Sequence, residues 1–233
     1  MKDQVISYFE MCLNEGGQTL QRGMNFRLNP QYSVVLMSQR SNAPYKDEIS
    51  SDGLQLTYEG HDEPKTKGID SPKLLDQPEK TKTGKLTQNG KFAQAAKEFK
   101  RGIRDAEIVR VYEKMFDGVW TDKGFFKLID YNYILDAAKK RKVFRFILEE
   151  VEVDFADGHL HENKLKPRTR IIPSSIKKEV WARDKGRCVE CGATDELHFD
   201  HDIPYSKGGS SITAENVKLL CARHNLQKSA KIQ

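Results

Sequence analysis

The sequence has 233 residues, of which 37% are hydrophobic and 31% are charged. This length predicts two domains, because single domains usually contain roughly 100–150 residues. Apolar runs such as Tyr32–Met37 are far shorter than the ~20 residues that cross a bilayer. Charged residues also occupy the N-terminus, where a signal peptide needs its apolar stretch. We therefore exclude the membrane and secreted classes and expect a cytoplasmic protein.

Charge indicates a possible partner but does not establish one. Lys and Arg outnumber Asp and Glu by 39 to 34, a net charge of +5, which permits nucleic-acid binding without requiring it. Two stretches concentrate positive charge where DNA phosphates could be met, although a solvated surface would have the same composition. The residues that we expect at the DNA backbone are Lys139, Lys140, Arg141, Lys142, Arg168, Arg170 and Lys228.

The chain begins with a predicted helix over residues 3–15. Apolar residues recur there at helical spacing, at Val5, Ile6, Phe9, Cys12 and Leu13. We interpret Cys12 as a small apolar residue on the buried face of this helix.

The pattern from Leu20 to about Leu160 is mainly that of strands. Short runs rich in β-branched and aromatic residues alternate with turn residues, and one helix is expected at Phe92–Lys100. Few apolar residues occur between Gly60 and Gly90, which predicts a long loop. The pattern favours a curled antiparallel sheet or barrel with flanking helices. The predicted strands are Gly23–Leu28, Tyr32–Met37, Leu54–Tyr58, Ala106–Tyr112, Gly124–Tyr131 and Lys142–Val153.

A second unit follows a change of composition at residues 161–173. Basic residues and two prolines interrupt all periodicity there, which is typical of an extended linker. Ser174 or Ser175 can then cap a helix through Ala182. The expected organisation is an α+β protein with an N-terminal unit (residues 1–160), a basic linker (161–173) and a C-terminal unit (174–233).

The C-terminal unit contains two half-sites for a metal ion. Cys188-x-x-Cys191 and Cys221-x-x-His224 together supply four soft or borderline ligands, as a tetrahedral zinc requires. The competing interpretation is a set of buried thiols beside an ordinary surface histidine. Structural zinc also suits a unit with so little apolar content, because metal binding contributes folding energy.

The segment between and after the half-sites reads as strand, loop, strand and short helix. A set of chemically distinctive residues lies in and just before this segment. They are Arg183-Asp184, Asp200-His201, Pro204, Gly208-Gly209, Asn216, Asn225 and Lys228, together with the two half-sites. From Arg183 to about Lys231 the chain resembles the HNH endonucleases with a ββα-metal core. This resemblance implies phosphodiester hydrolysis at a zinc-stabilised site.

The residue types suit that chemistry. A neutral imidazole and one Mg²⁺ or Mn²⁺ ion can activate water and stabilise the leaving oxygen. His201 is the candidate base, and Asp200 and Asn225 offer the hard oxygen ligands that Mg²⁺ prefers. The resemblance gives Asn216 the role of orienting His201 or its loop. Each of these residues alone could instead be structural, and we expect His198 and Asp202 to be exposed strand positions.

The N-terminal unit is similar to the SRA (YDG) family of modified-cytosine readers, from about Asn25 to Glu150. The resemblance depends on the Tyr32–Met37 strand, a Tyr and acidic loop, a Tyr-x-Gly turn, an Asn-Gly helix start, Val-Arg-Val-Tyr and a closing Val-Phe-Arg-Phe strand. The resemblance implies that one base is flipped out of the duplex and held between aromatic rings. A carboxylate would accept a hydrogen bond from the exocyclic amine of that base. Strand-edge packing and a solvated turn are the competing interpretations. The expected pocket residues are Tyr45, Asp47, Glu48, Tyr58 and Glu59.

These patterns predict a modification-dependent restriction endonuclease acting in phage defence. It would bind double-stranded DNA that carries 5-methylcytosine or 5-hydroxymethylcytosine, hold one structural zinc and use Mg²⁺ or Mn²⁺. It would form a homodimer if both strands must be cut. Two alternatives are an HNH nuclease of the homing or nicking type that reads sequence or shape, and a non-catalytic nucleic-acid binder with a PUA-like sheet.

Overall fold

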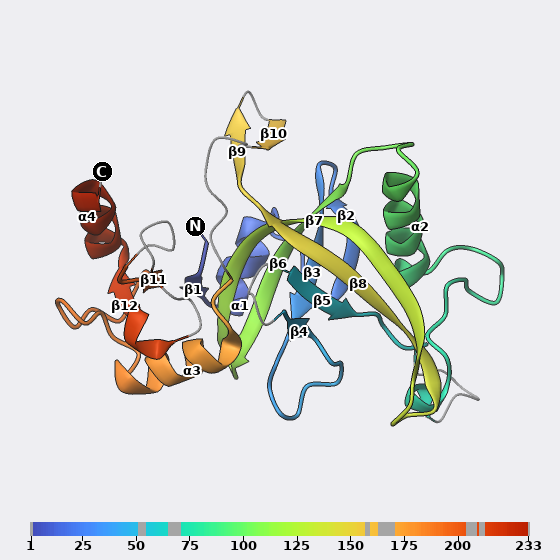
Figure 1. Ribbon diagram of the computed structural model, residues 1–233, viewed down its shortest axis with the longest axis horizontal. Coiled ribbons are helices and arrows are strands. Elements are labelled where there is room, and N and C mark those ends of the chain that lie inside the picture. Colours follow the sequence, from blue (N-terminus) through green and yellow to red (C-terminus); the bar gives the residue numbers. More distant parts are fainter. Residues whose placement is uncertain are drawn as a thin grey trace.

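Figure 1 shows the chain as a computed structural model, with a large curled sheet beside a smaller C-terminal unit. The structure describes residues 2–50, 55–64, 71–156, 159–162, 171–203, 209 and 213–232. The predicted DNA contacts Arg168 and Arg170 lie outside these residues. The described elements confirm the α+β class, and no helix among them is long and apolar enough to span a membrane.

The N-terminal unit holds most of the strands. Its elements, in chain order, are β1 (Gln4–Ile6), α1 (Tyr8–Asn14), β2 (Met24–Asn29), β3 (Tyr32–Met37), β4 (Glu48–Ile49), β5 (Gln55–Glu59), the short 3₁₀ helix η1 (Pro72–Leu74), α2 (Gln88–Lys100), β6 (Glu107–Phe116), β7 (Val119–Asp136), β8 (Arg141–Val151), β9 (Val153–Ala156) and β10 (His159–Glu162). The C-terminal elements are α3 (Ser174–Arg183), β11 (Leu197–His201), the 3₁₀ helix η3 (Ala214–Asn216), β12 (Val217–Cys221) and α4 (Ala222–Ile232).

Six of these strands correspond to the predicted ones, with ends that differ by a few residues. β6 and β7 are longer than expected because Gly118, with φ +80°, makes the turn that joins them as one hairpin. α2 begins earlier than predicted, because the Thr87 side chain accepts a hydrogen bond from Gly90 N (3.1 Å) and so caps the helix.

The helix predicted over residues 3–15 is wrong in its first part. Gln4–Ile6 form strand β1, and the helix begins only after Ser7. The Ser7 hydroxyl accepts from Glu10 N (3.2 Å), and the Glu10 carboxylate accepts from Ser7 N (2.7 Å), which is a capping box. Cys12 is buried as predicted, whereas Leu13 is exposed.

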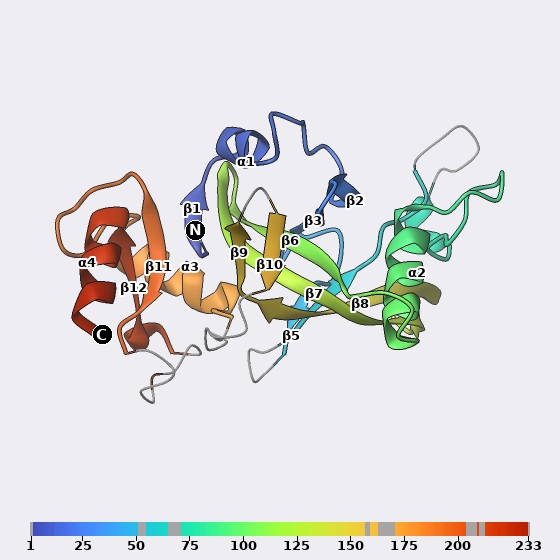
Figure 2. The same cartoon turned by 90° about the horizontal axis from the view of Figure 1, so that it is seen from above.

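The sheet is continuous from one unit to the other. Among the described residues it has ten strands, and its main path runs in the order β12-β11-β1-β7-β6-β3-β2. A branch from β7 through β8 to β5 and β4 curls the sheet. The pairing is antiparallel, as predicted, except that β3 and β6 are parallel. Figure 2 shows β1 between the C-terminal strands and the large sheet.

Apolar residues form three cores in the described part of the chain. The largest lies between α2 and the curled sheet, and a second, with Met11 and Tyr112, includes residues of α1 and the strands. The third core combines both units, because Met115 of β6 packs with Ile172, Val180 and Leu219.

Four charged side chains are buried where the two units meet. Lys177 Nζ of α3 lies 2.5 Å from Asp3 Oδ1 and 3.8 Å from Glu113 Oε2, and Lys123 Nζ lies 2.8 Å from Glu113 Oε2. We call Asp3, Glu113, Lys123 and Lys177 the ion cluster. Burial acts to raise the pKa of Asp3, but the charges of Lys177, Lys2 and Lys123 outweigh it and lower the pKa to about 2. Burial lowers the pKa of Lys123 to about 8, against the charge of Glu113.

The ion cluster predicts the effect of Lys177→Met. This substitution leaves Asp3 without its nearest opposite charge, so the free energy of unfolding should fall by about 3–5 kcal/mol. Urea unfolding measures the change. Lys178→Met, the next residue on the same helix and only half-buried, is the control and should change stability by no more than about 0.5 kcal/mol. Equal effects of the two substitutions would contradict the role of the cluster.

Candidate functional site

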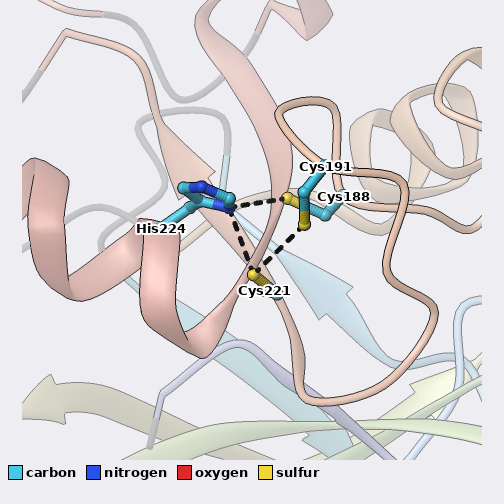
Figure 3. Close-up of side chains that lie close together, drawn as sticks. All are labelled: Cys188, Cys191, Cys221 and His224. Carbon is cyan, nitrogen blue, oxygen red and sulfur yellow. Dashed lines mark hydrogen bonds between the residues drawn. The ribbon is translucent and has the colours of Figure 1, made fainter.

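Three cysteines and one histidine meet in the C-terminal unit, with their donor atoms all within 4.8 Å of one another (Figure 3). Cys191 Sγ is 3.8 Å from Cys221 Sγ, and His224 Nδ1 is 3.5 Å from Cys188 Sγ and 3.3 Å from Cys221 Sγ. Around a tetrahedral zinc at about 2.3 Å from sulfur and about 2.0 Å from nitrogen, two sulfurs stand roughly 3.8 Å apart and a sulfur and a nitrogen roughly 3.5 Å apart. The four residues therefore fit a structural zinc site.

Local backbone contacts bring the half-sites together. Gly192, with φ +75°, donates its N–H to Cys188 O (2.8 Å) and closes the turn that carries the first two cysteines. Val189 N donates to Leu219 O (3.0 Å), which ties this turn to β12. Cys221 ends β12, and the histidine ligand follows in the first turn of α4.

The Cys188 thiol has an altered acidity. Burial acts to raise its pKa, but backbone N–H groups of Cys221, Glu190 and Cys191 and the side chain of His224 lower it, to a net value of about 6. Since a thiolate is the form that binds metal, this environment favours the ligand state.

The predicted catalytic residues lie at the end of β11. Asp200 and His201 are its last two residues, paired with Lys218 and Val217 of β12. Lys228 of α4 donates to Asp200 Oδ2 and to the carbonyl of His201. Asn225 precedes Lys228 by three residues and so shares its face of α4. Asp200 and Asn225 therefore come from neighbouring elements, and carboxylate and amide oxygens are ligand types that hard divalent cations prefer.

Asn216 holds the chain that leaves His201. Its side-chain oxygen accepts from Ile203 N (2.8 Å), its Nδ2 donates to Ile203 O (2.9 Å), and its carbonyl accepts from Asp202 N (2.7 Å). A Cβ at Gly209 would lie 1.8 Å from Ile203 O and 2.7 Å from Asn216 Nδ2, so only glycine fits there. These contacts fix the backbone that follows His201.

His201 is partly buried and lies near several charged groups. Burial lowers its pKa, and the nearby charges of Lys2 and Lys228 lower it further, while Asp3 and Asp200 oppose them. Within the described part of the chain, its Nε2 has no hydrogen-bond partner. A neutral imidazole with a free nitrogen can accept a proton.

The expectation that His198 is exposed is wrong. Its side chain is buried because β1 pairs along β11, with Gln4 opposite His198. Asp202 is exposed as expected, but it lies just after β11 and not in the strand, and its carboxylate is 2.9 Å from Lys218 Nζ.

Two of the five predicted pocket residues are inaccessible. Tyr58 is 1% exposed, lies in the main core and donates its hydroxyl to Gly23 O (2.9 Å). Glu59 is fully buried and accepts from Lys46 N (2.8 Å). Tyr58 therefore cannot stack on a base, and Glu59 does not lie at a rim, because the curled sheet encloses both.

Asp47 and Glu48 differ from each other in environment. Glu48 is exposed and pairs with Lys46 at 2.8 Å. The Asp47 carboxylate is buried, and it accepts backbone N–H groups of Ser38 (2.9 Å) and Glu59 (3.0 Å). Burial, with a smaller contribution from Glu59, raises the pKa of Asp47 to about 7. Asp47 therefore fixes the loop that carries Tyr45.

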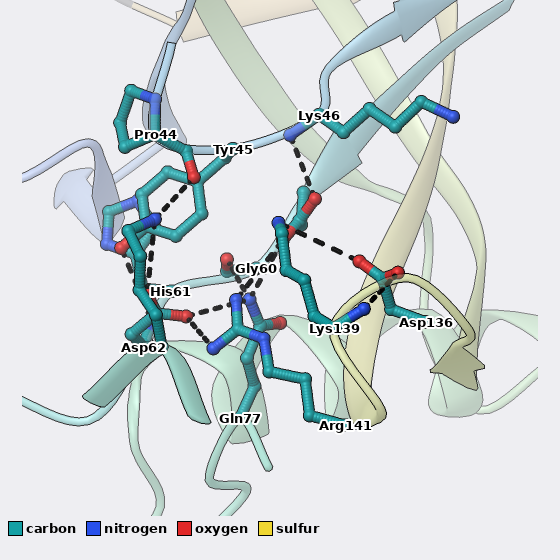
Figure 4. Close-up of polar contacts among 12 residues, drawn as sticks. Pro44, Tyr45, Lys46, Gly60, His61, Asp62, Gln77, Asp136, Lys139 and Arg141 are labelled. Carbon is teal, nitrogen blue, oxygen red and sulfur yellow. Dashed lines mark hydrogen bonds and ion pairs between the residues drawn. The ribbon is translucent and has the colours of Figure 1, made fainter. Parts of the chain in front are cut away.

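The prediction that Arg141 contacts DNA is wrong, because its side chain is fully buried. It reaches Asp62 Oδ1 (2.6 Å) and Glu59 Oε1 (3.6 Å), as Figure 4 shows for the Asp62 contact. Lys139 is partly exposed and lies 3.7 Å from both Glu59 and Asp136 carboxylates. Lys140 and Lys142 remain exposed at the end of the β7–β8 hairpin.

A pocket of about 520 Å³ opens beside Tyr45 and His61. The two rings are stacked, with centroids 4.9 Å apart and planes at 11° (Figure 4). Asn89 fixes His61, since its Oδ1 accepts from His61 N and its Nδ2 donates to His61 O, each at 2.8 Å. Burial lowers the pKa of His61 to about 4, so the ring is neutral. The sequence analysis missed His61, although it directly follows the Tyr-x-Gly turn.

Residues 188–231 match the family model described as HNH endonuclease. The chain therefore contains an HNH endonuclease domain over these residues, as the resemblance implied. A comparison with curated proteins finds no match.

Solved structures of SRA domains and of type IV restriction endonucleases are similar to the whole chain or to most of it. An SUVH5 SRA complex with hemi-methylated CG DNA is 15% identical and has a TM-score of 0.42, over 70% of this chain and 90% of that one. The modification-dependent TagI restriction endonuclease is 16% identical, with a TM-score of 0.42, over 97% of this chain and 76% of that one. The phosphorothioation-dependent restriction endonuclease ScoMcrA is 16% identical, with a TM-score of 0.41, over 98% of this chain and 55% of that one.

The metal centre predicts one zinc ion per purified chain. Chelation should unfold the C-terminal unit, because zinc binding contributes ~10–16 kcal/mol in small peptides. Elemental analysis and thermal unfolding measure both effects. Cys221→Ala should lose zinc, whereas Cys12→Ala, a buried cysteine outside the cluster, should keep it. Active protein without zinc would refute the assignment.

Proposed function

We propose that the protein is a modification-dependent DNA endonuclease. The N-terminal unit would bind a 5-methyl- or 5-hydroxymethylcytosine that is turned out of the duplex, and the HNH domain would cut the backbone. The observation that carries the nuclease half is the HNH match over 188–231, with Asp200 and His201 at the end of a strand that Asn216 anchors.

His201 would act as the general base. Its neutral ring takes a proton from water, and the resulting hydroxide attacks phosphorus in line with the oxygen that leaves. Asp200 and Asn225 would hold one Mg²⁺ or Mn²⁺. When bound, such an ion stabilises charge on the phosphate and the leaving oxygen. Lys228, which pairs with Asp200, would contact the phosphate at this site.

The pocket beside Tyr45 and His61 supports the proposal that the N-terminal unit binds a modified base. Its volume of about 520 Å³ lies within the range of small-molecule sites. A flipped base could replace one ring of the Tyr45–His61 stack and keep the stacking energy, which would offset the cost of unstacking the duplex. Lys46 and Lys73 are more than half exposed nearby, and Lys73 Nζ lies 5.0 Å from the Tyr45 ring centroid. The lining of the pocket itself carries charge of both signs, from Arg22, Asp62 and Glu63.

We assign residues 1–160 to modified-DNA binding and residues 174–233 to cleavage, with 161–173 as the basic connection. One HNH site cuts one strand at a time. A double-strand break would then need two chains, which is why we propose a homodimer on DNA.

His201→Ala should abolish cleavage of modified DNA while leaving binding and zinc content intact, because only the base is lost. Asp200→Ala and Asn225→Ala should raise the Mg²⁺ concentration that half-maximal cutting requires. Asp202→Ala, at the adjacent exposed position, is the control and should cut normally. Substantial turnover by His201→Ala would remove this residue from the mechanism.

Binding of a modified base by the N-terminal unit predicts that the protein prefers modified DNA to plain DNA. The full chain with His201→Ala should bind a duplex with one modified cytosine more tightly than the plain duplex at equal salt. Tyr45→Ala should reduce this preference by ~1–3 kcal/mol, the value of one base stack, with plain-DNA affinity unchanged. Tyr8→Ala, an exposed tyrosine on α1, is the control. A ratio near one for every modification would favour the nuclease that reads sequence or shape.

A further inference from the structure

Strand β1 belongs to both units at once. Its residues Gln4, Val5 and Ile6 pair with β7 at Asp122, Thr121 and Trp120, and Gln4 also pairs with His198 of β11. Phe199 N donates to Asp3 O (3.1 Å), so the backbone contact extends beyond the strand. The strand that carries Asp200 and His201 is therefore joined to the N-terminal sheet by backbone pairing.

The ion cluster joins the same two units through side chains. Lys177 comes from α3 of the C-terminal unit, and Glu113 and Lys123 come from the hairpin of β6 and β7. Lys177 also donates to Thr121 Oγ1 (3.3 Å), and Ser174 Oγ at the start of α3 donates to Glu113. Any hinge motion at this surface would separate buried opposite charges, which is strongly unfavourable.

Apolar packing completes the junction. Met115 of β6 lies in one core with Val180 and Leu219, and Val5 and Val119 pack against that core. Phe116 and Trp181 rings lie 6.2 Å apart across the junction. Close-packed apolar surfaces do not deform continuously. The β1 pairing, the ion cluster and this shared core therefore hold the junction together, and each depends on the other two.

We infer that the two units form one rigid body, joined by β1, the ion cluster and the shared core, so that the phosphate that is cut lies at a fixed number of base pairs from the base that is read. This inference rests on the proposed function. It also makes Lys177 a positioning residue, which acts on where the chain cuts and touches no substrate.

The chain connection between Glu162 and Ile171 gives the sharpest test. Inserting about ten Gly/Ser residues there adds a root-mean-square reach of roughly 17 Å, or about five base pairs at 3.4 Å each. If this connection alone positioned the nuclease, cuts would spread over that distance. A rigid junction predicts that the inserted variant and the natural chain cut at the same single position on each strand. The substrate is an end-labelled duplex with one 5-methylcytosine or 5-hydroxymethylcytosine, mapped at nucleotide resolution.

Lys177→Met tests the junction from the other side. A folded variant, verified by circular dichroism, should still cut modified DNA but lose the single position, whereas Lys178→Met should keep it. Scattered cuts by the natural chain, a shift in the inserted variant or an unchanged position in folded Lys177→Met would each overturn the inference. If Lys177→Met does not fold, the inserted variant decides. No cutting of any modified duplex would instead reject the proposed function.

Discussion

The fold depends on a buried electrostatic contact between the first residues of the chain and the C-terminal unit. Lys177 in the C-terminal unit meets Asp3, the third residue, and both are shielded from water beside Glu113 and Lys123. Charges at such depth persist only with close partners. The contact therefore fixes the residues before β1, and β1 in turn provides the edge on which β11 pairs.

Local interactions within the C-terminal unit shape the candidate nuclease site. The Cys₃His cluster fixes the turn before β11 and the start of α4, and Asn216 fixes the backbone after His201. Rigid supports on both sides of such a strand keep its side chains in fixed positions. Fixed positions of the reacting groups account for much of the rate acceleration of enzymes. Lys228 links the remaining element, α4, to Asp200.

The candidate reading site depends on a different buried network. Glu59 and Asp62 are surrounded by Arg141, Lys139 and Gln77, and this network holds the loop on which Tyr45 and His61 stack. The buried charges therefore shape the pocket without lining the stack itself. Lys140 and Lys142 remain exposed at the end of the β7–β8 hairpin.

The sequence by itself determined the features that depend on residues a few positions apart. The two metal half-sites, the Asp200-His201 pair and most strand positions are local patterns, because ligand geometry and side-chain alternation act over a few residues. Only the tertiary structure decided which residues are accessible. Arg141, Tyr58 and His198 are buried because segments distant in sequence cover them. Val5 and Ile6 form a strand and not a helix for the same reason, since β7 supplies their partners from more than a hundred residues away.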